Sequence, residues 1–218
     1  MKPLSMACAF ALGLAVAAVA PTALAEPVHP AASAPTAAPA APQLHAALRS
    51  LWHGHLVATH DYALAVHAGD KAGETKATDA VVANAKQIAN AVAGFYGKAA
   101  GDGLLQLLAG HWTGVKALTD TTKAADATGE QKAMNDLAGN ATAIAKFLAG
   151  ANPNWSEGTL QGALMMHVND HKTQIDQMMS NAPAAEQAKS WADMQHHMDM
   201  ISDVLASGIA KQFPNKAH

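Results

Sequence analysis

Three histidines stand in an even series along this chain. His55, His111 and His167 are each 56 positions apart, and each follows a short apolar stretch, in the sequences LWHGH, LLAGH and ALMMH. A neutral imidazole offers a nitrogen lone pair that suits zinc, copper, iron or nickel. If the fold brings the three segments together, the series predicts a shared metal site.

Further candidate ligands gather between residues 165 and 200, where histidines alternate with methionines. Thioether with imidazole is a ligand mixture that suits copper, particularly Cu(I), although methionine also fills irregular helical cores without any metal. Within this region HVNDH places two histidines four residues apart, on one face of a helix. The predicted metal ligands are His55, His111, His167 and His196. The weaker candidates are His171, His197, Met166 and Met198.

A structural role for the histidines is the competing interpretation. A buried imidazole without a hydrogen-bond partner costs roughly 1–3 kcal/mol, and an asparagine side chain is a suitable partner. Asn84 and Asn140 follow His55 and His111 by 29 residues, which would place each pair side by side in an antiparallel hairpin. On this interpretation the protein is a helical interaction or stress-response module that binds no metal.

A second series, His53, His60 and His67, is spaced by seven residues on another face of the first helix. Successive members lie about 10 Å apart along a helix, which is too far for one ion, so we expect a solvated stripe. No GxSxG, HExxH or glycine-rich phosphate loop occurs, and we predict no catalytic residues. The absence of CxxCH excludes covalent c-type haem, whereas b-type haem held by two histidines stays an alternative.

The N-terminal region predicts export. Residues 1–25 combine Lys2, the apolar run AFALGLAVAAVA and the small-residue ending TALA, as in a secretory signal peptide cleaved after Ala25. Residues 26–43 form an Ala/Pro-rich flexible linker. No later apolar run reaches the roughly 20 residues of a membrane span. We therefore expect a periplasmic or secreted protein, whose mature chain lacks the only cysteine, Cys8.

Residues 44–218 predict one all-α domain, a six-helix bundle. Apolar residues recur three and four positions apart, and helices are expected at about 44–68, 75–97, 101–125, 130–150, 157–180 and 184–212. Short turns between them indicate antiparallel hairpins. The segments 46–97, 102–153 and, more weakly, 158–209 align without gaps, which predicts three hairpins of a 56-residue internal repeat. The net charge of −3 and pI near 6.4 favour neither nucleic acid nor an anionic membrane as a partner.

An ordered set of motifs covers nearly the whole predicted domain: LWxxH, FYG, LLxxH, NAxxIAxFL, NPNW and GIAKQFP. In this set the chain resembles a family of uncharacterised bacterial proteins. The resemblance implies an all-helical bundle and no established activity, and it supports His55, His111 and His167 as the shared histidines. Together these observations predict an exported bundle that binds a transition metal, with copper favoured over zinc or iron, or a small cofactor.

Overall fold

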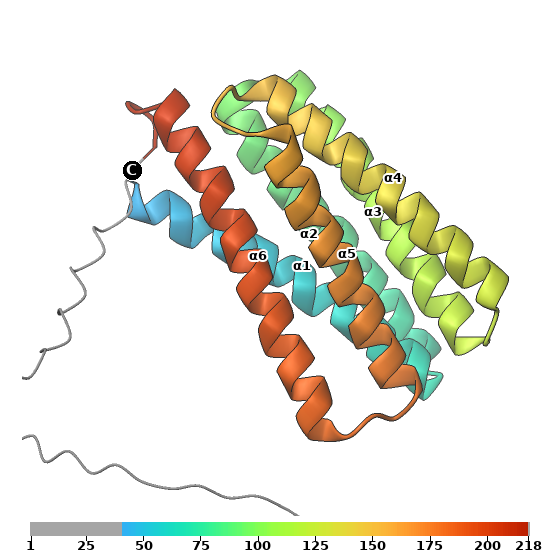
Figure 1. Ribbon diagram of the computed structural model, residues 1–218. Coiled ribbons are helices and arrows are strands. Elements are labelled where there is room, and N and C mark those ends of the chain that lie inside the picture. Colours follow the sequence, from blue (N-terminus) through green and yellow to red (C-terminus); the bar gives the residue numbers. More distant parts are fainter. Residues whose placement is uncertain (1–40, 218) are drawn as a thin grey trace, which may run out of the picture. The chain divides into compact units, whose positions relative to one another are not determined.

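The computed structural model describes residues 41–217, which form six α-helices and no strand within that range (Figure 1). The helices are α1 (Pro42–Ala68), α2 (Lys71–Tyr96), α3 (Lys98–Lys123), α4 (Ala127–Ala151), α5 (Glu157–Met179) and α6 (Ala184–Gln212). The predicted signal peptide, and the predicted linker as far as residue 40, lie outside the described residues. No helix in the described part of the chain has the length and hydrophobicity to cross a membrane.

Helices α2 and α4 begin earlier than the sequence predicts, because an aspartate caps each of them. Asp70 caps α2 by accepting hydrogen bonds from the backbone N–H groups of Ala72 and Gly73, and Asp126 caps α4 in the same way through Gly129. The sequence predicts starts at 75 and 130 because the glycines resemble turn residues. In the folded chain they occupy the first turn, whose free N–H groups the aspartates satisfy.

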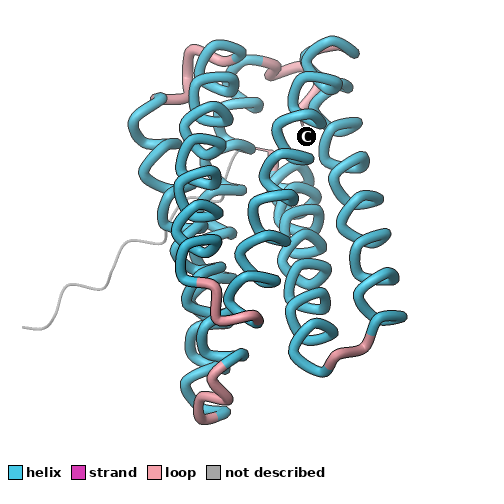
Figure 2. Tube along the Cα trace, turned by 90° about the vertical axis from the view of Figure 1, so that its right-hand side faces the viewer, coloured by secondary structure: helices cyan, strands magenta, loops and turns pink. Residues whose placement is uncertain are grey.

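The six helices divide into an inner and an outer set. The inner helices α1, α3 and α5 contact one another, and each outer helix packs between two inner ones: α2 between α1 and α3, α4 between α3 and α5, and α6 between α5 and α1. The connecting turns lie at the two ends of the bundle (Figure 2). Residues that face inward from α1, α3 and α5 therefore meet near the centre.

Apolar side chains form two core regions along the bundle. We name one the Tyr62 core; its members include Tyr62, Val115, Leu118, Leu137 and Ile175. The other, the Trp155 core, joins two adjoining clusters around Trp155. Its members include Leu48, Ile88, Leu104, Leu160, Ile201 and Leu205. Along each inner helix, the histidine of the 56-residue series stands between residues of the two cores.

The first two hairpins share a local contact. The side-chain amide of Asn84 donates to the carbonyl of Leu51 at 2.9 Å, and that of Asn140 donates to the carbonyl of Leu107 at 3.0 Å. Glycine stands beside each contact, because a Cβ at Gly54 or Gly110 would come within 2.8 or 3.0 Å of the amide nitrogen. The bundle of six helices is as predicted, whereas the internal repeat stays a prediction.

Candidate metal centre

Four histidines meet at the centre of the bundle, between the two cores. His55 comes from α1, His111 from α3, and His167 and His171 from successive turns of α5. Each offers a ring nitrogen, and these four atoms all lie within 4.8 Å of one another. All four residues are at most 6% exposed. We refer to them as the histidine cluster.

The rings of the histidine cluster are arranged almost as a tetrahedron. Their centroids are 5.6 to 5.8 Å apart for five of the six pairs, and 4.4 Å apart for His167 and His171. Four points in a square would have two diagonals about 1.4 times longer than the sides. The nearly equal separations therefore match tetrahedral coordination, not square-planar coordination.

Most ring nitrogens of this cluster lack hydrogen bonds. Both nitrogens of His111, both of His167 and Nε2 of His171 are buried with no partner among the described residues. An unpaired buried polar atom costs about 1–3 kcal/mol, and packed interiors rarely hold several together. Their convergence is the pattern expected when a group that the protein binds supplies the missing partner.

Burial also sets the charge of the cluster. It lowers the pKa of His55 to about 3 and that of His111 to about 4, since the interior solvates an imidazolium poorly. The pKa values of His167 and His171 are lowered well below the usual range, first by burial and then by the neighbouring imidazoles. The four rings are therefore neutral at pH 7, which is the form that binds metal ions.

The asparagines predicted to satisfy these histidines have a different contact. Their amide nitrogens bind backbone carbonyls, and the side-chain oxygens of Asn84 and Asn140 are themselves buried without a partner. Asn140 nevertheless lies near enough to His111 to oppose the lowering of its pKa. Neither asparagine oxygen accepts a hydrogen bond from a ring of the cluster.

The structure does not bring His196 into the cluster; its side chain is exposed on α6, and His171 completes the group of four. His197 instead pairs with Asp170, with 2.9 Å between Nδ1 and the carboxylate. Met198 is buried and lines a cavity together with three of the histidines, whereas Met166 is half-buried on α5.

The seven-residue stripe is not part of the cluster: His53 and His60 lie near Trp191 of α6, and the carbonyl of His67 accepts a hydrogen bond from Lys123 of α3. His53 is exposed, whereas His60 and His67 are half-buried, so the stripe is less solvated than expected. His60 packs on Trp191 with ring centroids 4.7 Å apart. The carboxylate of Asp203 binds His45 and Arg49 near the start of α1. It does not contact a member of the histidine cluster.

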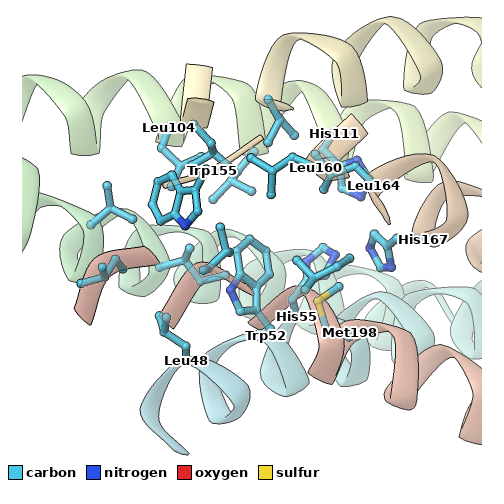
Figure 3. A pocket seen from close by; sticks show the side chains of 18 residues that line it. Leu48, Trp52, His55, Leu104, His111, Trp155, Leu160, Leu164, His167 and Met198 are labelled. Carbon is cyan, nitrogen blue, oxygen red and sulfur yellow. The ribbon is translucent and has the colours of Figure 1, made fainter. Parts of the chain in front are cut away.

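An apolar cavity of about 40 Å³ adjoins the cluster within the Trp155 core. His55, His111 and His167 lie together at one end of it, with Met198 beside them, and Leu48, Leu104 and Trp155 lie toward the other (Figure 3). His171 does not line it. This cavity was not predicted from the sequence, because leucines and isoleucines at helical spacing are found around a filled core as readily as around a hollow one.

No protein-family model, curated protein or solved structure matches this chain. The resemblance to a family of uncharacterised helical bundles stays a prediction from the motifs.

Proposed function

We propose that the protein binds one transition-metal ion through His55, His111, His167 and His171. One observation carries this proposal: four buried ring nitrogens from three helices lie within 4.8 Å of one another, and the cluster contains five ring nitrogens without a hydrogen bond. An ion would give the neutral imidazoles the partner that the fold does not supply.

The fit requires only a modest contraction. Four nitrogens at 2.0–2.1 Å from a tetrahedral ion are about 3.4 Å from one another. The ring nitrogens now lie within 4.8 Å, so side-chain rotations without refolding of the helices would close the site. Because the ligands come from α1, α3 and α5, binding would also tie the inner helices together.

The ligand set favours a d10 ion, and Cu(I) over Zn(II). A tetrahedral arrangement opposes Cu(II) and Ni(II), which prefer square-planar or tetragonal sites. Four neutral imidazoles leave the charge of the ion uncompensated in a buried place. The cost of burying an ion rises with the square of its charge, so a monovalent ion has about one quarter of the penalty of a divalent ion of equal size. The thioether of Met198 in the adjoining wall suits the same soft ion.

Two other interpretations of the histidines fit less well. A purely structural role predicts hydrogen-bonded imidazoles, and most nitrogens of the cluster have no such bond. A b-type haem needs a pocket of several hundred Å³, as cofactor sites generally do, and the adjoining cavity is about 40 Å³.

Metal analysis of untagged protein, purified from its native cell compartment, tests the proposal. We expect one equivalent of copper per chain. Metal-free protein should then take up Cu(I), under anaerobic conditions and against a competing chelator, more tightly than it takes up Ni(II). Protein that carries no metal and does not bind Cu(I) or Zn(II) in vitro would overturn the proposal.

A matched pair of variants on α1 locates the site. His55→Phe keeps a ring of similar shape without a ligand nitrogen, and we expect it to weaken Cu(I) binding at least 100-fold. His53→Phe, two residues away on the exposed face, should leave the affinity unchanged. Equal affinities for the two variants would remove His55 from the site.

We also propose that this site works outside the cytoplasm. The N-terminal 25 residues support export, and a chain without thiols after Ala25 suits an oxidising compartment. Cell fractionation and N-terminal sequencing should find a mature protein that begins at Glu26. A cytoplasmic protein that retains Met1 would contradict export without affecting metal binding.

We further propose that the hairpins repeat one unit, which would explain why three inner helices each bring a histidine to the same level. The matched amide contacts at Leu51 and Leu107 and the matched caps Asp70 and Asp126 support it. A chain in which residues 46–97 replace 102–153 should therefore fold and bind the same ion. Failure of that chain to form a helical monomer would count against the repeat.

A further inference from the structure

The cavity beside the histidine cluster is almost entirely apolar. All six helices contribute to its lining, chiefly through leucine, isoleucine and valine, and the polar exceptions are the three imidazoles at one end and the indole groups. Its volume of about 40 Å³ exceeds the roughly 10–15 Å³ that one water molecule requires. Size alone would therefore admit water.

Chemistry opposes water in most of this space. A buried water molecule makes about three hydrogen bonds, and apolar cavities that cannot provide them stay dry and bind small apolar molecules such as xenon. Away from the histidines, the walls are side chains such as Ile88, Leu104 and Leu205, which have no hydrogen-bonding atoms. The indole nitrogen of Trp155 donates to the carbonyl of Val204 at 3.2 Å, whereas that of Trp52 is buried without a partner. Apart from the imidazoles, the lining therefore offers water one free donor, not the three partners that it needs.

We propose that this cavity is a binding chamber for a small uncharged apolar molecule, of the size of dioxygen or xenon, next to the histidine cluster. The chamber touches His55, His111 and His167 but not His171. A molecule within it would therefore approach the cluster through the face formed by one histidine from each inner helix. The walls of the chamber are side chains of the six helices and Trp155, so this proposal does not depend on metal binding.

The far wall of the chamber contains a close fit between Trp155 and Gly208. Trp155 is 4% exposed, and a Cβ at Gly208 would collide with its indole ring. Glycine at this point of α6 allows the indole to lie against the helix and line the chamber. The chamber is thus bounded by a specific contact at one end and by the histidine cluster at the other.

Dioxygen itself serves as the probe, because it is paramagnetic and accelerates the relaxation of nearby methyl groups. NMR spectra of metal-free protein under dissolved dioxygen should show relaxation enhancements several-fold larger at Leu160 and Ile201, which line the chamber, than at Leu118 and Leu137 in the Tyr62 core. All four residues are at most 3% exposed, so access from solvent does not explain a difference. Equal enhancements in the two cores would overturn the proposal.

Variants show whether the effect belongs to the chamber. Leu164→Phe fills the space and should reduce the enhancement at Leu160, whereas Leu118→Phe is an equal change outside the chamber and should not. If Leu164→Phe fails to fold, Leu160→Ala enlarges the chamber and should raise the enhancement at Ile201. An enhancement at Ile201 that does not rise in Leu160→Ala would contradict the chamber. Because every sample is metal-free, the result is separate from any failure of metal binding.

Discussion

The Tyr62 core and the Trp155 core are built on the same three inner helices, yet the cavity beside the histidine cluster lies in the Trp155 core. In the Tyr62 core, residues such as Leu118 and Leu137 have no exposed surface, and the Tyr62 hydroxyl donates to Asp120 at 2.8 Å. The Trp155 core contains large aromatic rings and a cavity of about 40 Å³. The histidine cluster lies where the two cores meet.

This difference indicates a division of roles within one bundle. A close-packed core determines the arrangement of the inner helices, since it tolerates little change in volume. A cavity forgoes dispersion contacts and so reduces stability locally. The Tyr62 core would thus hold the histidines in place while the Trp155 core provides space beside them.

Acidification should lower the free energy of unfolding of the metal-free protein more than any substitution below. The loss should come from the histidine cluster, which lies where the two cores meet. Above pH 6.5 the four imidazoles are neutral in both the folded and the unfolded chain. As pH falls below 6.5, the unfolded chain takes up protons, while the folded cluster, with pKa values of about 3 for His55 and about 4 for His111, does not. Each such histidine therefore lowers the free energy of unfolding by about 1.4 kcal/mol per pH unit in that interval.

Urea unfolding between pH 8 and pH 5 measures this slope. His111→Phe should reduce this slope by the contribution of one proton, because its imidazole has a pKa of about 4 in the folded chain. The titrating groups beside the cluster are its own members and His197, which contributes to the low pKa of His167. A stability that does not change between pH 7 and pH 5 would show that the cluster is not buried in a neutral form.

A second comparison adds one methyl group to a helix in each core. Gly208→Ala would force Cβ against the rigid indole of Trp155, which also donates to Val204, and we expect a loss of about 2–3 kcal/mol. Gly114→Ala would bring Cβ to 2.7 Å from both Cγ and Cδ2 of the fully buried Leu137, so that leucine would have to shift within a packed core. Its net cost should be about 1–2 kcal/mol, below that at Gly208, because a leucine yields more readily than a hydrogen-bonded indole ring and alanine favours the helix. Denaturant titrations give both values, and a larger loss at Gly114 would reverse the comparison.

Removal of one hydroxyl from each core should have a smaller effect. The Tyr96 hydroxyl accepts a hydrogen bond from the buried Asn152 at 2.8 Å and donates to Gln212 at 3.0 Å. Tyr96→Phe leaves the Asn152 amide unpaired and should cost about 2 kcal/mol. Tyr62→Phe removes one bond to the partly exposed Asp120 and should cost about 1 kcal/mol. Thermal unfolding of the two variants decides the order, and equal costs would show that Asn152 finds another partner.

Much of this fold follows from the sequence. Helical periodicity and the loop residues predict six helices, and five of their starts and all of their ends fall within about three residues of the structure. The late starts predicted for α2 and α4, relative to Lys71 and Ala127, arise because a glycine in the first helical turn resembles a glycine in a loop. Which helices are inner and which are outer was not predicted, because both sets have apolar faces and only packing separates them.

The candidate site was predicted in part, for a reason that lies in helix geometry. Equal spacing along the chain identifies His55, His111 and His167, and helical spacing places His171 one turn after His167 on the same face. The choice of His196 assumed that the third hairpin repeats the position of Asn84 and Asn140. Those asparagines bind backbone carbonyls of the preceding helix, whereas the side chain of His196 is exposed on α6.

Substitution of His196 should have the smallest effect on stability, and it separates the role of His196 from that of His171. His196 is exposed on α6, so His196→Gln should change the free energy of unfolding by less than about 0.5 kcal/mol. It should also leave Cu(I) affinity unchanged. His171→Gln, which alters a residue that is 1% exposed within the cluster, should weaken Cu(I) binding by 100-fold or more. Competition with a chromogenic Cu(I) chelator measures both affinities. Loss of binding in His196→Gln, with binding retained in His171→Gln, would place the ion near α6 and outside the layer where the two cores meet.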